Sequence, residues 1–137
     1  MNEDTNTIIR AYLVAQTTLT DVVPAAQIQS PRLAENTDRP ALSFFTRGGS
    51  ASPYIPGIVI PSIQFDCWGD SPIEARAVYL ALFKVLQGIQ NVAVATAAGD
   101  FIVLGATEEV QGQDMADEIQ GYFRVLSFFA IMIMAEY

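Results

Sequence analysis

Few residues of this chain have the chemistry of a catalytic nucleophile or base. The sequence contains no histidine, the commonest general base and zinc ligand. The only cysteine, Cys67, stands in an apolar strand pattern that favours a buried structural thiol. The only lysine, Lys84, shares a helix face with Arg76 and Gln87, which favours a solvated or interface role. Asp66 alternates away from the expected core, where capping or pairing with an arginine is favoured over catalysis. We therefore expect a protein that is not an enzyme.

An acidic segment is the other candidate for site chemistry. The stretch GATEEVQGQDMADEIQG carries five of the fifteen acidic residues and no basic one: Glu108, Glu109, Asp114, Asp117 and Glu118. Their spacing lacks the alternating oxygen ligands and closing glutamate of a calcium loop. The pair Gly48-Gly49 likewise lacks the spacing of a phosphate-binding loop. We expect no metal or cofactor, and an acidic, solvated loop over about 107–120.

Composition excludes further classes of function. The net charge is −8 and the seven basic residues are scattered along the chain, which argues against nucleic-acid binding. A lone cysteine excludes an internal disulfide and fits a reducing compartment. No apolar run approaches the ~20 residues of a membrane helix, and the acidic, polar N-terminal stretch does not read as a signal peptide. We expect a protein kept in the cytoplasm, or assembled there into something larger, with no membrane partner.

The expected elements fit a single domain over residues 1–137. Helical periodicity and capping residues indicate a helix over 4–16 and a second one that begins after Ser71, with Pro72 at its first position and Glu74 completing a capping box. Pro61 suggests an edge position or a bulge in its strand. A flexible loop is expected over about 47–57, because glycine, proline and serine dominate it. Strands are expected over 26–30, 41–47, 58–68, 92–96, 101–106 and 121–137. This order predicts an α+β fold, a mostly antiparallel sheet with two main helices packed on one side.

The chain also has more apolar surface than one subunit can cover. Charged residues make up only 16 % of the sequence and hydrophobic ones 51 %, against about a quarter charged in a typical globular protein. The second helix is apolar on its outer side as well as its inner side, and the last strand is apolar on both faces. Such residues are typical of an obligate interface. We therefore predict self-association through Ile73, Leu80, Phe83, Leu126, Phe128, Met132 and Met134.

Several motifs occur in the order found in one viral family. An N-terminal helix and a polar stretch precede RPALSFF, and a strand ending IQFDCWG leads into the capped helix SPIEARAVYLALFKVLQGI, a strand pair and a final strand. The sequence resembles the tail-completion, or tail-terminator, proteins of long-tailed bacteriophages. In that family a strand ending in Asp-x-Trp precedes a helix with Glu-Ala in its first turn, matching Asp66, Trp68, Glu74 and Ala75. The likeness covers nearly the whole chain.

The resemblance implies a structural protein of the virion, in its tail or neck, assembled in the host cytoplasm. Such proteins form a ring, usually a hexamer, that caps the tail tube and joins it to the head, with the major tail-tube protein and a head-completion protein as partners. The middle loop, with Arg47, Tyr54 and Ile55, would contact a neighbouring subunit or the tube. DNA would pass through without specific binding, and the acidic segment would either face this channel or dock onto a basic partner. Two alternatives stay open: a head-side connector of the same neck, and a small α+β module that binds an apolar ligand.

Overall fold

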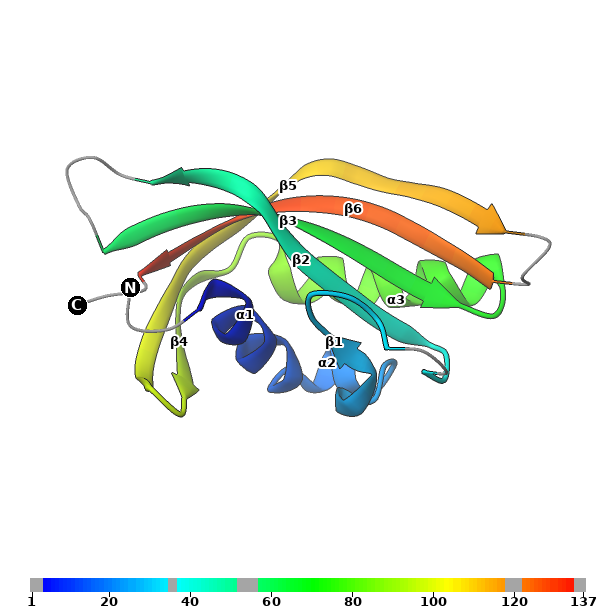
Figure 1. Ribbon diagram of the computed structural model, residues 1–137, viewed down its shortest axis with the longest axis horizontal. Coiled ribbons are helices and arrows are strands. Elements are labelled where there is room, and N and C mark those ends of the chain that lie inside the picture. Colours follow the sequence, from blue (N-terminus) through cyan, green and yellow to red (C-terminus); the bar gives the residue numbers. More distant parts are fainter. Residues whose placement is uncertain (1–3, 35–36, 52–56, 118–121, 135–137) are drawn as a thin grey trace.

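The computed structural model contains one six-stranded sheet and three helices (Figure 1). It describes residues 4–34, 37–51, 57–117 and 122–134. The sheet order is β1-β2-β3-β6-β5-β4, and every pairing is antiparallel except the short parallel one of β1 with β2. The predicted α+β class is confirmed. In chain order the elements are α1 (Thr5–Val14), α2 (Thr17–Thr20), a 3₁₀ turn (Ala25–Gln27), β1 (Ile28–Gln29), β2 (Ala41–Ala51), β3 (Ile58–Gly69), α3 (Pro72–Leu86), β4 (Gln90–Thr96), β5 (Gly99–Asp117) and β6 (Tyr122–Met134).

All three helices lie on the same side of the sheet (Figure 1). The core fills the space between them and the sheet, with Phe44, Phe65 and Phe129 of β2, β3 and β6 fully buried at its centre. The Phe65 ring lies 5.5 Å from that of Phe44 and 5.6 Å from that of Phe129, between centroids. The hydroxyl of Tyr12 on α1 donates to the backbone carbonyl of Val85 on α3, so the two main helices are joined inside this core. No helix of the described residues lies over the opposite face of the sheet.

Local sequence signals determine where α3 begins and ends. Ser71 is the N-cap, its hydroxyl accepting a hydrogen bond from the Glu74 amide at 3.1 Å, and Pro72 occupies the first position. Gly88, with φ of +80°, follows the last turn, as expected for a helix end in the left-handed region. The predicted inner face is buried from Ala75 to Leu86.

The central strand β3 keeps the predicted alternation but not the predicted edge position. Ile63, Phe65 and Cys67 are fully buried on the helix side. Because β3 lies between β2 and β6, the edge alternative for Pro61 was wrong. The bulge alternative is confirmed, although the extra residue is in the partner strand β2, whose register with β3 shifts between Thr46 and Gly49. Gly49, opposite Pro61, lies so close to β3 that a Cβ atom would approach the Ile60 carbonyl to 2.3 Å. The bulge lets a residue without an N–H sit inside the sheet.

Two segments expected as loops are largely strand. β2 continues through 47–51, into the proposed flexible loop, whose residues 52–56 lie outside the described chain together with Tyr54 and Ile55. The proposed acidic loop is the second half of the 19-residue β5, which pairs with β6 down to Asp117↔Tyr122. Glu118 lies outside the described residues. The expectation of a loop was wrong because pairing with the apolar β6 holds this polar segment in the sheet, although Glu109 and Asp114 are exposed as expected. The predicted hairpin of β4 and β5 closes between Thr96 and Gly99.

Candidate interaction surfaces

The face of the sheet without helices carries the second apolar side of β6. Val125, Ser127, Phe129, Ile131 and Ile133 are buried on the helix side. The alternate residues are half-buried or exposed on what we call the open face, where Met132 is 38 % exposed. The register places beside them residues of β3 and β5, including Gln64, Asp66 and Val110. The alternation thus follows the sequence pattern, and Leu126, Phe128, Met132 and Met134 all belong to the open face.

A polar row crosses the open face next to Phe128. Arg47 on β2 donates to the Ser62 hydroxyl on β3 at 3.4 Å, and Ser62 donates to the Glu109 carboxylate on β5 at 2.7 Å. The Arg47 guanidinium carbon lies 4.0 Å from the centroid of the Phe128 ring, within cation–π distance. Ala130 of the intervening strand β6 lies opposite Ser62. Its small methyl group leaves room for the hydrogen bond from Ser62 to Glu109 across β6. Arg47 and Glu109 are therefore held on the surface of the sheet.

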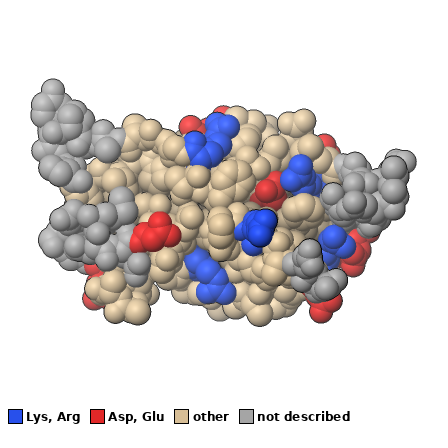
Figure 2. All heavy atoms as spheres, in the orientation of Figure 1, with Lys and Arg blue, Asp and Glu red and all other residues tan. Residues whose placement is uncertain are grey.

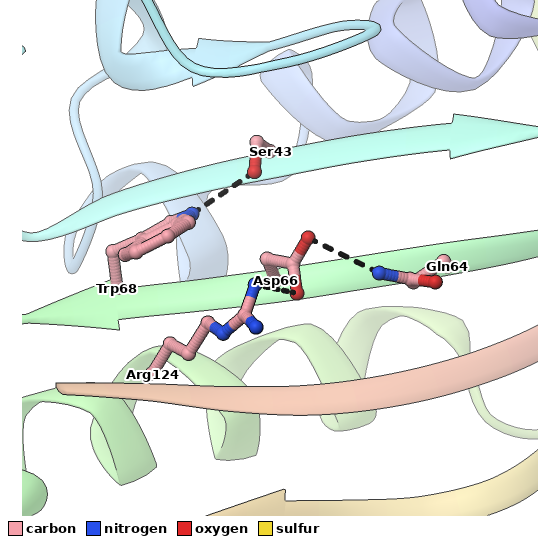
Figure 3. A network of polar contacts seen from close by, with 5 residues as sticks. All are labelled: Ser43, Gln64, Asp66, Trp68 and Arg124. Carbon is pink, nitrogen blue, oxygen red and sulfur yellow. Dashed lines mark hydrogen bonds and ion pairs between the residues drawn. The ribbon is translucent and has the colours of Figure 1, made fainter. Parts of the chain in front are cut away.

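A second polar cluster lies toward the other end of β3 (Figure 3). Asp66 pairs with Arg124 of β6 at 3.4 Å and accepts a bond from Gln64 at 3.5 Å. The indole N–H of Trp68 donates to the Ser43 hydroxyl at 2.9 Å. Asp66 is only 6 % exposed, and burial raises the pKa of its carboxyl against the lowering effects of Arg124 and of the Gln64 bond. The expected pairing of Asp66 with an arginine is present.

The connection before β2 builds a hollow over this cluster. Its volume is about 500 Å³, and its walls come from residues 31–34, Thr37 and Arg39 on one side and the sheet on the other. Trp68 and Phe45 supply the apolar part, while Arg32, Arg39 and Asp66 supply charge. Arg39 also pairs with Asp70 at 3.6 Å. The polar composition of the 31–40 stretch predicted a loop but gave no sign that it folds over the sheet.

The outer side of α3 forms a different uncovered surface. Ile73 is 82 % exposed and Leu80 is 54 % exposed. Ala77 and Lys84 are exposed on the same side, at helical spacing. Phe83 is half-buried, packs against the core and lies 6.4 Å from the Tyr79 ring. Of the three α3 residues predicted at the interface, Phe83 therefore also contributes to the interior of the subunit.

Glu108, Glu109 and Asp114 of β5 contact neighbouring side chains. Glu108 accepts hydrogen bonds from Tyr79 on α3 at 2.5 Å and from the buried Ser127 of β6 at 3.1 Å. Burial and the bond to Glu108 raise the pKa of Tyr79, so its hydroxyl remains a donor at neutral pH. Asp114 pairs with Arg76 at 3.1 Å. Glu109 belongs to the polar row. The predicted acidic segment therefore divides into Glu108 and Asp114, which hold β5 against α3, and Glu109, which faces the open side.

The same contacts cover part of the outer edge of β5. β4 pairs only with the first half of β5, so the edge from Ala106 onward lacks a strand partner among the described residues. There the Gln87 side chain accepts from the Glu108 amide at 2.9 Å, and Arg76 donates to the Gly112 carbonyl at 3.4 Å. Gly112 sits directly under α3, where a Cβ atom would lie 2.7–2.9 Å from Val125, Arg76 and Tyr79. Side chains of α3 and of its C-cap residue thus satisfy backbone groups that could otherwise pair with another strand.

The described residues contain no arrangement typical of a catalytic or metal centre. Cys67 is fully buried, and burial, together with the Asp66 charge, raises the pKa of its thiol far above the usual range. No group of three or more acidic, cysteine or histidine side chains in this part of the chain could hold a metal ion. No described helix is long and apolar enough to cross a membrane. Figure 2 shows basic and acidic side chains interspersed on the face it presents, without a continuous basic patch.

Sequence reasoning missed some parts of these surfaces. Val110, 45 % exposed, and Met115, 37 % exposed, add to the apolar surface but stand within the acidic segment. A strand assignment would have drawn attention to them. The Arg47–Ser62–Glu109 row joins three strands and has no local signal in the sequence.

Comparison with known proteins identifies the fold. No family model matches the sequence, and no curated protein matches it. The structure is similar to that of a chain in a structure described as the virion of a native gene transfer agent (GTA) particle, with a TM-score of 0.67 and 12 % sequence identity. The match covers 94 % of this chain and 93 % of that one. The whole α+β architecture, rather than one motif within it, is therefore shared with a chain of that particle.

Proposed function

We propose that this protein is a structural component of a phage-like virion, and that it forms the ring that caps the tail tube and joins it to the head. The observation that carries the proposal is the fold shared along nearly the whole chain with a component of a gene transfer agent virion. The sequence resemblance to tail-terminator proteins supports the narrower role. The protein has no catalytic task in this proposal and acts by assembly.

The uncovered apolar surfaces support an assembling subunit. Ile73 and Leu80 on one side of the molecule and Met132 and Val110 on the other are large apolar side chains, 38–82 % exposed. Burial of apolar area contributes roughly 25 cal/mol per Å², so each such residue favours association once a neighbour covers it. The partners in the proposal are further copies of this chain, the major tail-tube protein and a head-completion protein.

The acidic segment keeps the two alternatives that the sequence predicted for it, facing the channel or docking onto a basic partner. Because Glu108 and Asp114 are bonded within the subunit, we propose these roles for the remaining acids of the segment and test them at Asp117 and Glu118. In a ring these charges would be repeated in every subunit. Repulsion over about a Debye length, roughly 8 Å at physiological salt, would then keep passing DNA from adhering to the wall. A basic partner surface would be the alternative contact.

The test combines the purified chain with tail tubes. Native mass spectrometry and electron microscopy of the chain, alone and with tubes of its tail-tube protein, are expected to show a ring and density at one tube end. Tubes capped in this way stop elongating when more tube protein is added. A chain that stays monomeric with tubes present and leaves both ends growing would refute the proposal. Rings that bind head connectors but not tubes would assign the head-side role instead.

Replacing Asp117 and Glu118 with lysine separates the two roles of the acidic segment. If the segment faces the channel, rings still join heads to tails while DNA ejection slows because the duplex adheres. If the segment docks onto a basic partner, joining itself fails although rings form. The matched control is the pair Asp21 and Asp38, two exposed acids elsewhere, changed to lysine for the same change in net charge.

A further inference from the structure

Each subunit presents two apolar surfaces on opposite sides. The first, the α3 stripe, consists of Ile73, Ala77, Leu80 and Lys84, all exposed. The second, the sheet patch, lies on the open face and consists of Glu109, Val110, Leu126, Phe128 and Met132. The body of α3 and the thickness of the sheet lie between them, because α3 packs with its other side on the helix face of the sheet (Figure 1).

From this arrangement we infer that the α3 stripe of one subunit packs on the sheet patch of the next, so that the ring of the proposed function is built from one repeated head-to-tail contact. A symmetric pair of subunits uses the same patch twice and would leave the other surface of both copies in water. A head-to-tail contact covers both surfaces in every copy once the ring closes. The inference rests on the proposed function for the closure of the ring.

The two surfaces match in length, and a helix packed on a sheet is a common arrangement of two layers. From Ile73 to Lys84 the stripe is about 16 Å long, at 1.5 Å per helical residue. From Leu126 to Met132 the patch is about 20 Å long, at about 3.3 Å per strand residue. A neighbour's α3 lying there would give the sheet a helical layer on its second face, as in other sheets that are apolar on both sides.

The surfaces also match in charge. Among the described residues, Lys84 makes no ion pair and follows Leu80 by one turn on the stripe. Glu109 is exposed and is held on the open face by its bond to Ser62. The β5 register shifts between Glu108 and Val110, and Val110 lies opposite Phe128. Glu109 and Val110 therefore both face the patch, where the Arg47 guanidinium lies over the Phe128 ring and the Glu109 carboxylate makes no ion pair among the described residues. The stripe presents one ammonium group beside apolar groups, so Lys84 can pair with the Glu109 carboxylate across the contact.

Mixing two assembly-defective variants tests this contact. Leu80→Asp damages only the stripe and Val110→Asp only the patch. Both positions are exposed, so the folded monomer is expected to remain, as checked by circular dichroism. Each variant alone should lose the ring and run as a monomer. An equal mixture should give a 1:1 heterodimer with twice the monomer mass in native mass spectrometry, because one intact stripe meets one intact patch. Thr18→Asp, an exposed helical site outside both surfaces, is the control that should still form rings.

A cysteine pair supplies a second readout. Leu80→Cys and Val110→Cys in one chain, after mild oxidation, should give a covalent ladder of subunits up to the ring. Leu80→Cys alone should give no ladder. Cys67 is fully buried and does not compete.

The outcomes separate this inference from the proposed function. Suppose that the wild-type chain forms rings. If the single variants still form rings, or if the folded mixture gives no heterodimer and the cysteine pair no ladder, the head-to-tail contact is overturned while the ring itself stands. Covalent dimers from Leu80→Cys alone would show a symmetric contact and overturn it as well. A wild-type chain that forms no ring even on tail tubes refutes the proposed function, and the inference with it.

Discussion

Substitution of Gly112 by alanine should destabilise the protein, because α3 packs directly on this point of β5. A Cβ atom there would lie 2.7 Å from Val125 Cγ1 and 2.9 Å from both Arg76 Nη1 and Tyr79 Cζ. The end of Arg76 can move, but Val125 and Tyr79 are 1 % and 7 % exposed and are held by the core. Forcing a methyl group into such a site costs about 1–3 kcal/mol.

Gly105→Ala in the same strand is the matched control. Its Cβ atom would meet only the Ile89 carbonyl at 3.6 Å, an ordinary contact. Both substitutions remove the same freedom from the unfolded chain, worth about 0.4–1 kcal/mol, so this term cancels between the two variants. The Gly112 variant should therefore be less stable than the Gly105 variant by about 1–3 kcal/mol, which corresponds to roughly 3–10 °C in Tm for a chain of this size.

The assay is thermal and urea unfolding of both variants at one protein concentration, because any self-association would make Tm depend on concentration. Melting temperatures equal within about 1 °C, well below the shift expected for one kcal/mol, would refute the reasoning. Such a result would mean that the segment around Gly112 is not packed under α3, as in the loop that the sequence alone suggested.

Three further predictions follow from single contacts. Ser71→Ala, which removes the bond to the Glu74 amide, should lower the free energy of unfolding by about 0.5–2 kcal/mol, whereas Ser71→Asp, which keeps an acceptor, should lower it less in the same urea titration. The Cys67 thiol should react with a thiol reagent only as fast as the protein unfolds, because it is buried with a raised pKa; rapid reaction under native conditions would contradict its placement. Because burial raises the pKa of Asp66, the folded state holds its proton more tightly, so this group's contribution to stability falls as pH rises from about 4, its unfolded value, through the folded pKa. Asp66→Asn should lack this decline in unfolding measured across pH, and parallel curves for the two proteins would contradict it.

Local signals explain which elements the sequence predicted well. The start of α3 depends on Ser71 and Pro72, whose effects act within one turn and need no distant partner. The alternation in β6 was equally informative, because its buried and open faces differ at every second residue. The β4–β5 turn follows from Gly99, with φ of +137°, between two apolar runs.

Non-local contacts explain what the sequence left undetermined. The strand character of 107–117 depends on β6 and on Tyr79 and Arg76 of α3, which satisfy its acids and backbone groups. Pro61 sits inside the sheet because β2 bulges opposite it at Gly49. The hollow over Trp68 exists because residues 31–34, Thr37 and Arg39 lie across it from the sheet. Each of these pairings joins residues far apart in the chain.

The sequence by itself determined the fold class, the inner face of α3, the two-faced character of β6 and the surplus of apolar residues, because composition and short-range periodicity set these. Only the tertiary structure decided where the surplus lies: a stripe outside α3 and a patch on the opposite side of the sheet. The physical reason is that sheet order and register are set by contacts between distant segments. Those contacts determine which apolar side chains the chain buries and which it leaves exposed.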